Sequence, residues 1–429
     1  MTMARQAKTR RQILRGAGSA AAVAAAWPRT LRAQAPPRVV IVGGGFAGAS
    51  CARALRAADS RLAITLVEAR RIYTAPPLSN SVLGGLRELS DQQFGYDKIA
   101  AAGISVVFAA VLAVDAGAQS VTLSTGAKLP FDKLVLAPGI ALRFDALPGY
   151  DEAAAAAAPH AWTADGAQYD LLRRQIAAMD DGGLVAIVAP ANPSRCPPGP
   201  YERASMIARA LKTTKPRSKV VILDAKDAFT MQPLFLNAWQ ELYPGMIEWK
   251  SLSSGGNVAS IDVKKKTIET DFDTYQYAVA NVIPPQQAGK IAALAGVADR
   301  TGWCPVDPVT FESLLHKNIH VIGDAALAGA MPKSAFSGAI EGKLCAAALA
   351  RVLAGATAAA AQLPSNCYSL VAPGYAISIS GLFEPVNGEY AAVDNSIHSS
   401  PLDAPPSLRA EEANNADAWF RTTTAEIFG

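Results

Sequence analysis

The sequence has few cysteines and histidines, and no motif that would gather them into a haem or metal site. There are five cysteines and four histidines among 429 residues. No Cys-x-x-Cys and no Cys-x-x-Cys-His occurs, so covalent haem is not expected, and the histidines are too scattered for a metal site. In an oxidising compartment the odd cysteine count leaves at least one thiol unpaired.

The chain also lacks a charge excess and a membrane-spanning run once residues 1–35 are set aside. These residues combine a twin-arginine pattern at 9–14, an apolar stretch at 16–27 and Ala33-Gln34-Ala35, which fits an A-x-A cleavage site. We therefore predict a twin-arginine signal peptide at 1–35 and export to the periplasm. The alternative is a buried helix with a basic end.

Removal of that segment changes the charge of the chain. Residues 1–35 hold seven of the 40 Lys and Arg residues and none of the 36 Asp and Glu residues, which leaves a formal charge of −3. This charge does not favour nucleic acid as a partner. No later stretch is predicted to span a membrane, and 394 residues suffice for two or three domains of about 150 residues each.

The strongest motif is a dinucleotide-binding fingerprint. The buried-strand run 38–42 precedes Gly43-Gly44-Gly45-Phe46-Ala47-Gly48, and an alanine-rich helix and a second strand at 62–67 follow. In such a unit the first glycine permits a tight turn, the second lets the backbone approach the pyrophosphate, the third lets helix pack on strand, and an acid after the second strand accepts ribose hydroxyls. The alternative is a glycine turn without ligand. The assigned cofactor residues are Gly43, Gly45, Phe46, Ala47, Gly48 and Glu68.

Two distant segments favour FAD over NAD as the cofactor. Residues 134–139 (Leu-Val-Leu-Ala-Pro-Gly) and 319–324 (Ile-His-Val-Ile-Gly-Asp) are each an apolar strand that ends in small or acidic residues. This resembles flavoproteins with two dinucleotide domains, in which the Gly-Asp carboxylate reaches the ribityl chain. We therefore predict FAD beside Pro138, Gly139 and Asp324. The alternative for Asp324 is an N-cap of the following helix.

A second β-α-β unit lacks the glycines that a nucleotide needs. Its strands are predicted at 184–188 and 220–223, with a helix at about 201–211, but the loop reads Ala189-Pro190-Ala191-Asn192-Pro193-Ser194-Arg195-Cys196. A proline-stiffened turn of this kind cannot cradle a pyrophosphate, although it can present a sulfur atom. NAD(P)H is therefore not the expected electron partner.

Several unusual strings resemble the flavoprotein subunit of flavocytochrome c sulfide dehydrogenase, over nearly the whole chain after residue 35. They are Arg195-Cys196-Pro197-Pro198-Gly199-Pro200-Tyr201-Glu202-Arg203, Ile283-Pro284-Pro285-Gln286, Gly302-Trp303-Cys304-Pro305-Val306-Asp307, Met331-Pro332-Lys333-Ser334 and Asn366-Cys367-Tyr368-Ser369.

The resemblance implies an α/β fold with two Rossmann-like dinucleotide-binding domains, similar to glutathione reductase, and a C-terminal α+β interface domain. The FAD-binding domain would comprise 36–160 and 291–356, and the second Rossmann-like domain 161–290. Residues 357–429 would cover the flavin and face a cytochrome. In that last region the sequence turns polar and proline-rich and loses helical periodicity, while alternation at 375–383 and 389–393 predicts a hairpin.

The resemblance also implies a redox-active disulfide between Cys196 and Cys367 against the flavin. Hydrosulfide would attack one sulfur to give a persulfide and a free thiolate, and electrons would pass through FAD to a separate c-type cytochrome. Which cysteine carries the persulfide stays open. The alternative is a structural disulfide, which would stabilise the chain by about 5 kcal/mol in the entropy model.

Several further residues are assigned roles, some from their position and some from the resemblance. Glu202 is a candidate acid or base, or equally a surface carboxylate paired with Arg203 or Arg195. Trp419 would lie near the flavin, or be a core aromatic of the last helix. Cys51 and Cys345 are expected to be buried helix residues, and Cys304 receives no role. Further cofactor contacts would be Val111, Lys333 and Ser334.

One departure concerns the attachment of the flavin. Members of the family commonly link FAD through a cysteine in the segment that here reads Tyr73-Thr74-Ala75-Pro76-Pro77-Leu78-Ser79-Asn80, which contains none. We therefore predict that FAD binds noncovalently.

Together these patterns predict a periplasmic, FAD-dependent sulfide dehydrogenase subunit. Two alternatives stay open: a related sulfur-oxidation flavoprotein that acts on thiols or persulfides, and a noncatalytic flavin-binding accessory protein.

Overall fold

The fingerprint lies in a five-stranded parallel sheet with the order β20-β9-β1-β2-β5. The structure is a computed structural model that describes residues 35–429, so the predicted signal peptide, apart from its last residue, lies outside the described residues. The near-continuous apolar runs are buried on both faces, as parallel strands are. The strands are β1 (Arg38–Val42), β2 (Ala63–Glu68), β5 (Ser105–Phe108), β9 (Lys133–Leu136) and β20 (Ile319–Val321).

Helices α2 (Phe46–Ala58) and α9 (Ala335–Leu353) pack closely because small residues line their contact. A Cβ atom added to Gly342 would lie 2.3 Å from the Ala47 carbonyl oxygen, so only glycine allows this approach. Cys51 and Cys345 face each other in this contact and are fully buried, as predicted.

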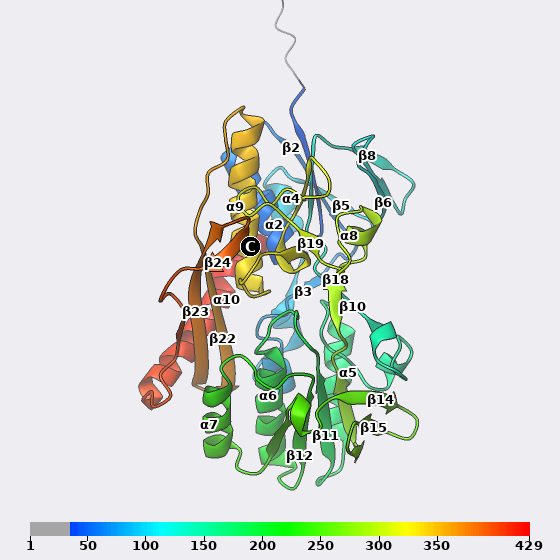
Figure 1. Ribbon diagram of the computed structural model, residues 1–429, viewed down its shortest axis with the longest axis vertical. Helices are drawn as coiled ribbons and strands as arrows, with labels where there is room; N and C mark the ends of the chain where they lie inside the picture. The colour runs from blue at the N-terminus through cyan, green and yellow to red at the C-terminus, as the bar shows by residue number, and fades with distance from the viewer. Residues whose placement is uncertain (1–34) are drawn as a thin grey trace, which may run out of the picture. The chain divides into compact units, whose positions relative to one another are not determined.

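The second β-α-β unit forms a separate parallel sheet of order β13-β12-β11-β17. Figure 1 shows the two sheets at opposite ends of the described fold. Both predicted strands and the predicted helix are present, and the α/β fold class is confirmed. The elements are α5 (Gly166–Ala178), β11 (Leu184–Ala189), α6 (Gly199–Thr214), β12 (Lys219–Asp224), α7 (Gln232–Leu242), β13 (Ile247–Lys250) and β17 (Val279–Val282).

Short elements connect and flank the two sheets. The strands are β3 (Tyr73–Thr74), β4 (Gln93–Phe94), β6 (Val111–Asp115), β7 (Ser120–Leu123), β8 (Lys128–Pro130), β10 (Ile140–Leu142), β14 (Val258–Asp262), β15 (Thr267–Thr270), β16 (Thr274–Gln276), β18 (Gln286–Ala288), β19 (Cys304–Pro305) and β21 (Ala326–Leu327), and the helices are α3 (Asn80–Leu83), α4 (Asp97–Ala101) and α8 (Ile291–Leu294).

The C-terminal region joins the two halves. The predicted hairpin is confirmed as β23 (Tyr375–Val386) and β24 (Glu389–Ala392), and the pair β22 (Leu363–Ala372) and β23 extends it. Strand β22 packs against α9 of the first half and against α6 and α7 of the second. This arrangement brings Cys367 of β22 between the two halves.

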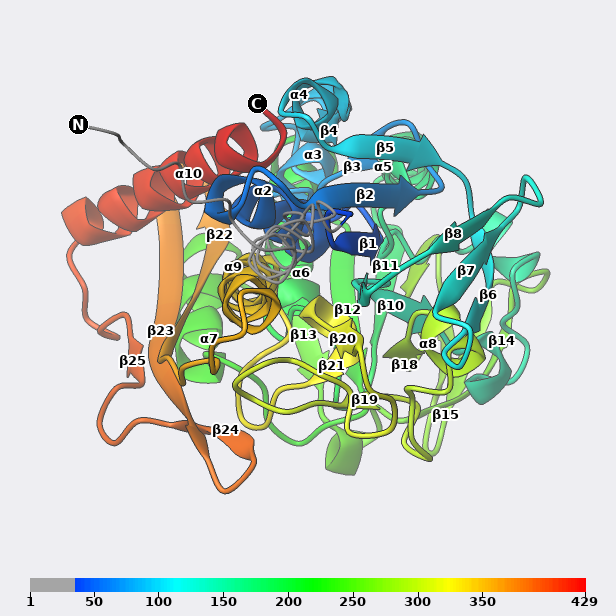
Figure 2. The ribbon, with the colours of Figure 1, turned by 90° about the horizontal axis from the view of Figure 1, so that it is seen from above.

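The expected loss of helical periodicity after about residue 357 is wrong for the last segment, which forms α10 (Pro406–Phe428). In Figure 2 this helix lies across β22 and β23 and reaches α2. Its buried face includes the ion pair of Arg409 with Glu412, whose side chains are 3% and 9% exposed. An amphipathic helix is recognised by apolar residues along its buried face. Here Arg409 and Glu412 occupy two positions of that face, so the helical periodicity is weak in the sequence.

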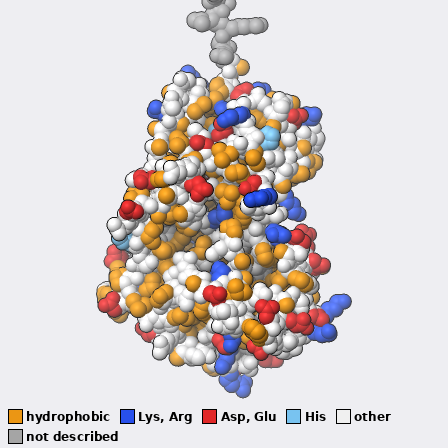
Figure 3. All heavy atoms as spheres, in the orientation of Figure 1, with side chains coloured by type: hydrophobic (Ala, Val, Ile, Leu, Met, Phe, Trp, Pro, Cys, Tyr) orange, Lys and Arg blue, Asp and Glu red, His pale blue; other side chains and the backbone are white. Residues whose placement is uncertain are grey.

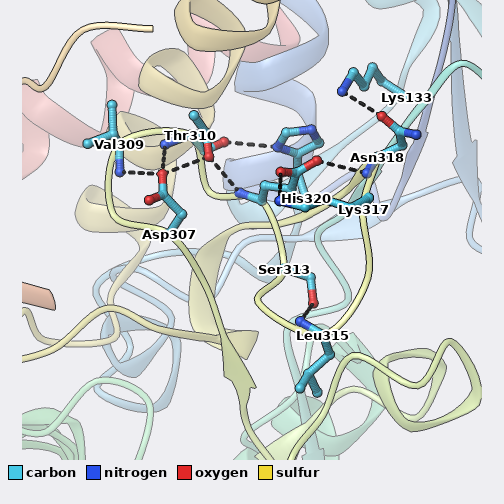
Figure 4. Close-up of polar contacts among 10 residues, drawn as sticks. Lys133, Asp307, Val309, Thr310, Ser313, Leu315, Lys317, Asn318 and His320 are labelled. Carbon is cyan, nitrogen blue, oxygen red and sulfur yellow. Dashed lines mark hydrogen bonds and ion pairs between the residues drawn. The ribbon is translucent and has the colours of Figure 1, made fainter. Parts of the chain in front are cut away.

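The turn before β20 is held by polar contacts among side chains and backbone (Figure 4). Asp307 accepts hydrogen bonds from the Thr310 amide at 2.8 Å and hydroxyl at 2.7 Å. The ring of His320 contacts the Thr310 carbonyl oxygen at 2.9 Å, and Lys133 on β9 donates to Asn318 at 2.8 Å. These contacts fix the strand that leads into Asp324.

On the face in Figure 3 basic and acidic side chains are interspersed rather than gathered by sign. Between residues 35 and 429 no helix is long and apolar enough to cross a bilayer. Within the same range no three His, Cys, Asp or Glu side chains are arranged to hold a metal ion.

The end of α10 offers a test of the fold. The ring of Phe428 packs against the rings of Phe46, Tyr73 and Phe94 at centroid distances of 6.1, 5.5 and 5.2 Å. We expect Phe428→Ala to lower the free energy of unfolding by about 3–5 kcal/mol because it leaves a cavity. Urea denaturation measures the change. Phe272→Ala, at a ring that is 73% exposed, should cost less than about 0.5 kcal/mol, and equal losses in both variants would contradict the assignment.

Candidate functional site

One large cavity, of about 480 Å³, lies where the two halves meet β22 and α10. Its wall contains all three predicted catalytic residues and most of the predicted cofactor residues. The predicted residues on the wall are Gly43, Gly45, Phe46, Ala47, Glu68, Val111, Pro138, Gly139, Cys196, Glu202, Asp324, Ser334, Cys367 and Trp419.

The glycine loop is shaped to hold a dinucleotide. Gly43 has φ +102°, and a Cβ atom there would lie 2.2 Å from the Ala137 carbonyl oxygen. A Cβ atom on Gly48 would lie 1.9 Å from the Gly43 carbonyl oxygen, so this glycine permits the turn but does not line the cavity. Gly45 caps α2 without a side-chain hydrogen bond, which leaves the first amides of the helix for a phosphate.

Carboxyl groups mark two further points of this wall. Glu68 ends β2 and accepts hydrogen bonds from the Gly44 amide at 2.7 Å and the Arg70 amide at 2.9 Å. Asp324 lies in a short turn before β21, and burial raises its pKa, opposed by Arg195 and Lys333. The N-cap alternative for Asp324 is wrong, because Ser334 caps α9 through the Ser337 amide.

Cys196 sits in a strained turn immediately before α6. Its φ is +53°, in the left-handed region. Its amide donates to the Lys333 carbonyl oxygen at 2.8 Å, and its carbonyl accepts from the Gly199 amide at 2.8 Å. A Cβ atom on Gly199 would lie 3.0 Å from the Cys196 sulfur. The sulfur therefore lies close to the first residue of α6.

Cys196 and Cys367 line the same cavity but are not bonded, and none of the five cysteines forms a disulfide within residues 35–429. Burial raises the pKa of the Cys367 thiol to about 11, with the Ser334 side chain opposing the rise. Burial, followed by Glu202 and Cys367, also raises the pKa of Cys196, while Arg195 opposes it. The structure thus shows the dithiol arrangement, and the disulfide stays a prediction.

Glu202 is not a surface carboxylate, so that alternative is wrong. It is 5% exposed, lies in the first turn of α6, and makes no ion pair among the described residues. Burial raises its pKa to about 7, and the side chains of Asn80 and Ser369 and the charge of Arg203 oppose the rise. A carboxyl with this pKa exchanges protons near neutral pH, as an acid or base must.

The guanidinium of Arg203 is committed to holding the wall. It is 1% exposed and donates to Asn80 Oδ1 at 2.9 Å and to the carbonyl oxygens of His160 and Ala161 at 3.0 and 2.7 Å. It also donates to Asn281 Oδ1 at 3.0 Å. These bonds tie four separate segments together around the cavity.

Lys333 and Trp419 were both predicted to contact the cofactor, and they differ in whether they line the cavity. Lys333 does not line the cavity; its ammonium donates to the carbonyl oxygens of Asp324 and Ala326 and lies 4.2 Å from the centre of the Trp303 ring. Trp419 packs on the core and stacks on Phe46 at a centroid distance of 6.2 Å, so its interpretation as a core aromatic is confirmed. It also lines the cavity, and its place near the flavin stays a prediction.

Sequence reasoning missed several residues of the wall. Trp162 and Tyr169 line the cavity although they come from segments without a recognisable motif. Trp162 is 3% exposed and lies under both Arg195 and Arg203, at 5.6 and 4.8 Å from its ring centre. No spacing in the sequence places this tryptophan beside Cys196, so only the tertiary structure could reveal it.

The second sheet gives an additional reason to expect no nicotinamide nucleotide there. Asp224 ends β12, where a dinucleotide domain has its ribose-binding acid. Here the carboxylate is fully buried and accepts from Tyr201 at 2.5 Å, Trp249 at 2.9 Å and Lys226 at 2.5 Å. Its oxygens are therefore used inside the protein.

Comparison with known families matches three parts of the chain. Residues 37–180 match the pyridine nucleotide-disulphide oxidoreductases, 169–284 the central domain of the sulfide dehydrogenase (flavocytochrome c) flavoprotein chain, and 359–428 the flavin-binding domain of flavocytochrome c sulphide dehydrogenase. Over 45 residues the chain is 51% identical to the sulfide dehydrogenase (flavocytochrome c) flavoprotein chain of Chlorobaculum thiosulfatiphilum, which covers 94% of that sequence and 10% of this chain.

The chain belongs to the flavocytochrome c sulfide dehydrogenase flavoprotein family. FAD is accordingly its cofactor, as predicted. The glycine loop, the uncapped start of α2 and the carboxyl groups of Glu68 and Asp324 fit that cofactor and are the groups that would hold it.

More distant relatives share the fold over longer stretches. The chain is 20% identical to the mitochondrial sulfide:quinone oxidoreductase of Mus musculus over 302 residues, 67% of this chain and 65% of that one. The solved structure of the sulfide:quinone oxidoreductase from Aquifex aeolicus has a TM-score of 0.71 at 17% identity, covering 91% of this chain and 92% of that chain. The NAD-dependent persulfide reductase from A. fulgidus has a TM-score of 0.61 at 15% identity, covering 89% and 77%.

The raised pKa of Glu202 predicts a pH dependence of stability. The unfolded carboxyl ionises from about pH 4.5 while the folded one stays protonated up to about pH 7. The folded state therefore loses stability as the pH rises through this window. Between pH 4.5 and pH 7 the free energy of unfolding of the wild type should fall by about 3 kcal/mol more than that of Glu202→Gln. Urea denaturation of both proteins between pH 4 and pH 8 measures this. Parallel pH profiles would show that Glu202 ionises normally.

Proposed function

We propose that the chain is the flavin-containing subunit of a sulfide dehydrogenase, which oxidises hydrosulfide at a Cys196–Cys367 disulfide. The observation that carries the proposal is the shared cavity: two cysteines and a carboxyl of raised pKa line the same space as the dinucleotide loop and Asp324. This combination supports sulfur chemistry next to a flavin.

The first chemical step follows from thiol–disulfide exchange. Hydrosulfide attacks one sulfur of the oxidised pair, the bond between the two cysteine sulfurs breaks, and a new sulfur–sulfur bond makes a cysteine persulfide. The electron pair of the broken bond leaves on the other cysteine as a thiolate. Bound FAD would supply the two-electron acceptor that re-oxidises the cysteine pair once oxidised sulfur has been released. Reduced flavin can then transfer its electrons one at a time.

Glu202 would act as the general acid or base of this step. Its carboxyl shares the cavity wall with the two cysteines, and its charge raises the pKa of both thiols. With a pKa of about 7 it can take the proton from hydrogen sulfide before attack or return one to the departing thiolate.

The same proposal covers location and electron acceptor. The twin-arginine pattern supports export to the periplasm, and the family supports a c-type cytochrome subunit as acceptor. The internally used Asp224 and the glycine-free loop before α6 favour such a partner over NAD(P)H.

Sulfide-dependent bleaching of the flavin tests the activity and the role of the cysteines. Under anaerobic conditions we expect sulfide to bleach the flavin absorbance of the wild-type holoprotein. Cys196→Ser should slow the bleaching at least about 10²-fold because the nucleophile's target is lost. Cys304→Ala, at a buried cysteine outside the cavity, is the matched control.

The outcomes of that experiment separate the alternatives. No bleaching by sulfide in the wild type would favour the noncatalytic accessory protein, and bleaching by thiols or persulfides alone would favour the related flavoprotein. A Cys196→Ser protein that bleaches at the wild-type rate would overturn the disulfide mechanism.

The attachment of the flavin is a separate test. Residues 73–80 line the cavity with Tyr73, Pro76, Pro77, Leu78, Ser79 and Asn80, and no cysteine side chain is available there for a thioether. We expect FAD to be released completely when the holoprotein is precipitated with acid, as measured by flavin absorbance of the supernatant. Flavin that remains with the polypeptide would refute noncovalent binding.

A further inference from the structure

Two arginines, Arg195 and Arg203, line the side of the cavity that holds Cys196, Cys367 and Glu202, which we call the sulfur side. Only Arg203 has most of its donors bonded to other groups of the protein. Arg203 spends its donors on four oxygen acceptors. Arg195, in contrast, makes a single side-chain hydrogen bond among the described residues, from Nη2 to the Trp162 carbonyl oxygen, and no ion pair. A partly buried guanidinium with its other donors unused is uncommon, because buried charge is normally paired.

Arg195 belongs to the cavity wall, and two of its guanidinium nitrogens have no protein partner. The residue lines the wall, its Nε is buried without a partner, and its Nη1 makes no hydrogen bond and is not among the buried nitrogen atoms. Its backbone amide donates to Gln286 Oε1 at 2.8 Å, and the Trp162 ring supports the guanidinium at 5.6 Å. The charge is thus held in place from two sides while one face stays open.

The open face is close to the reactive sulfur. Arg195 precedes Cys196 directly, and a Cβ atom on Gly199 would touch both the Trp162 ring at 2.6 Å and the Cys196 sulfur at 3.0 Å. The Trp162 ring, on which the Arg195 guanidinium packs, is therefore separated from the Cys196 sulfur only by Gly199. A small anion on the guanidinium would be within the same part of the cavity as Cys196.

We propose that Arg195 is the anion-binding residue that receives hydrosulfide beside Cys196. The proposal rests on the proposed function for the identity of the anion, and on the unpaired guanidinium for the site. A charge-assisted contact of this kind raises the local concentration of the anionic nucleophile. It would also hold the terminal sulfur of an anionic persulfide after attack.

Alkylation of Cys196 tests the site without any sulfide oxidation. The holoprotein is reduced, freed of reductant under anaerobic conditions, and treated with iodoacetate or with the neutral iodoacetamide, and the Cys196 peptide is quantified by mass spectrometry. The measured quantity is the rate with iodoacetate divided by the rate with iodoacetamide. This ratio is then divided by the same ratio for 2-mercaptoethanol. We expect Arg195→Gln to lower the ratio about 5- to 10-fold, and Arg195→Lys to keep most of it.

The matched control is Arg217→Gln, which removes the same charge from an exposed ion pair with Asp181 outside the cavity and should leave the ratio unchanged. An equal ratio in wild type and Arg195→Gln would overturn the proposal. Because the ratio cancels changes in thiol reactivity, a merely structural role of Arg195 would not move it. If the glutamine variant fails to fold, Arg195→Met, which also removes the charge, takes its place in the comparison.

Steady-state sulfide oxidation then identifies the anion. We expect Arg195→Gln to raise KM for sulfide about 10-fold, with kcat within about twofold and the FAD content unchanged. Loss of FAD from this variant would assign Arg195 to the cofactor and overturn the proposal. If the wild type does not oxidise sulfide at all, the proposed function fails, while the alkylation ratio still decides whether Arg195 binds anions.

Discussion

The buried guanidinium of Arg203 is the contact on which the arrangement of the sulfur side depends. Its hydrogen bonds join α6 to Asn80, to the carbonyl oxygens of residues 160 and 161, and to Asn281 on β17. A buried charge is tolerated only when such partners surround it, and removal of a partner is costly. The same bonds help to place Glu202 and Trp162 on the cavity wall, because Glu202 directly precedes Arg203 and Trp162 directly follows Ala161. The conformation of this wall is therefore set by one satisfied charge.

Two walls of different chemistry face the same cavity. The first is built from glycines and helix amides of the fingerprint and is suited to phosphate. The second is built from Cys196, Cys367 and Glu202 and is suited to sulfur and proton transfer. The loop after β11 occupies the position of a second nucleotide loop, but there the sequence exchanges glycines for a stiff turn with Cys196 in a left-handed conformation. With Asp224 already bonded inside the protein, this half of the fold supports the flavin site instead of a second nucleotide.

The local patterns predicted the fold well, and they failed where burial of polar groups decided the outcome. Both β-α-β units and the C-terminal hairpin follow from apolar runs and turn residues, since these signals act over short distances. The helix α10 was hidden because Arg409 and Glu412 are buried as a pair. Asp324 was a plausible N-cap by position, yet the N-cap of α9 is Ser334, and the helix begins only at Ala335. Glu202 was ambiguous because a sequence does not show whether a carboxyl is paired or buried.

The sequence by itself determined the chemistry that is available: a dinucleotide loop, an FAD-type second segment, three cysteines in unusual strings, and no cysteine at 73–80 for a flavin link. These features depend on residue type and short spacing, which a linear chain displays directly. Only the tertiary structure decided which groups meet. It brought β22 with Cys367 to the turn of Cys196, placed Trp162 beneath Arg195, and left that guanidinium unpaired while Arg203 was fully bonded. The reason is physical: burial and pairing depend on contacts between segments more than a hundred residues apart, such as that of Asn80 with Arg203.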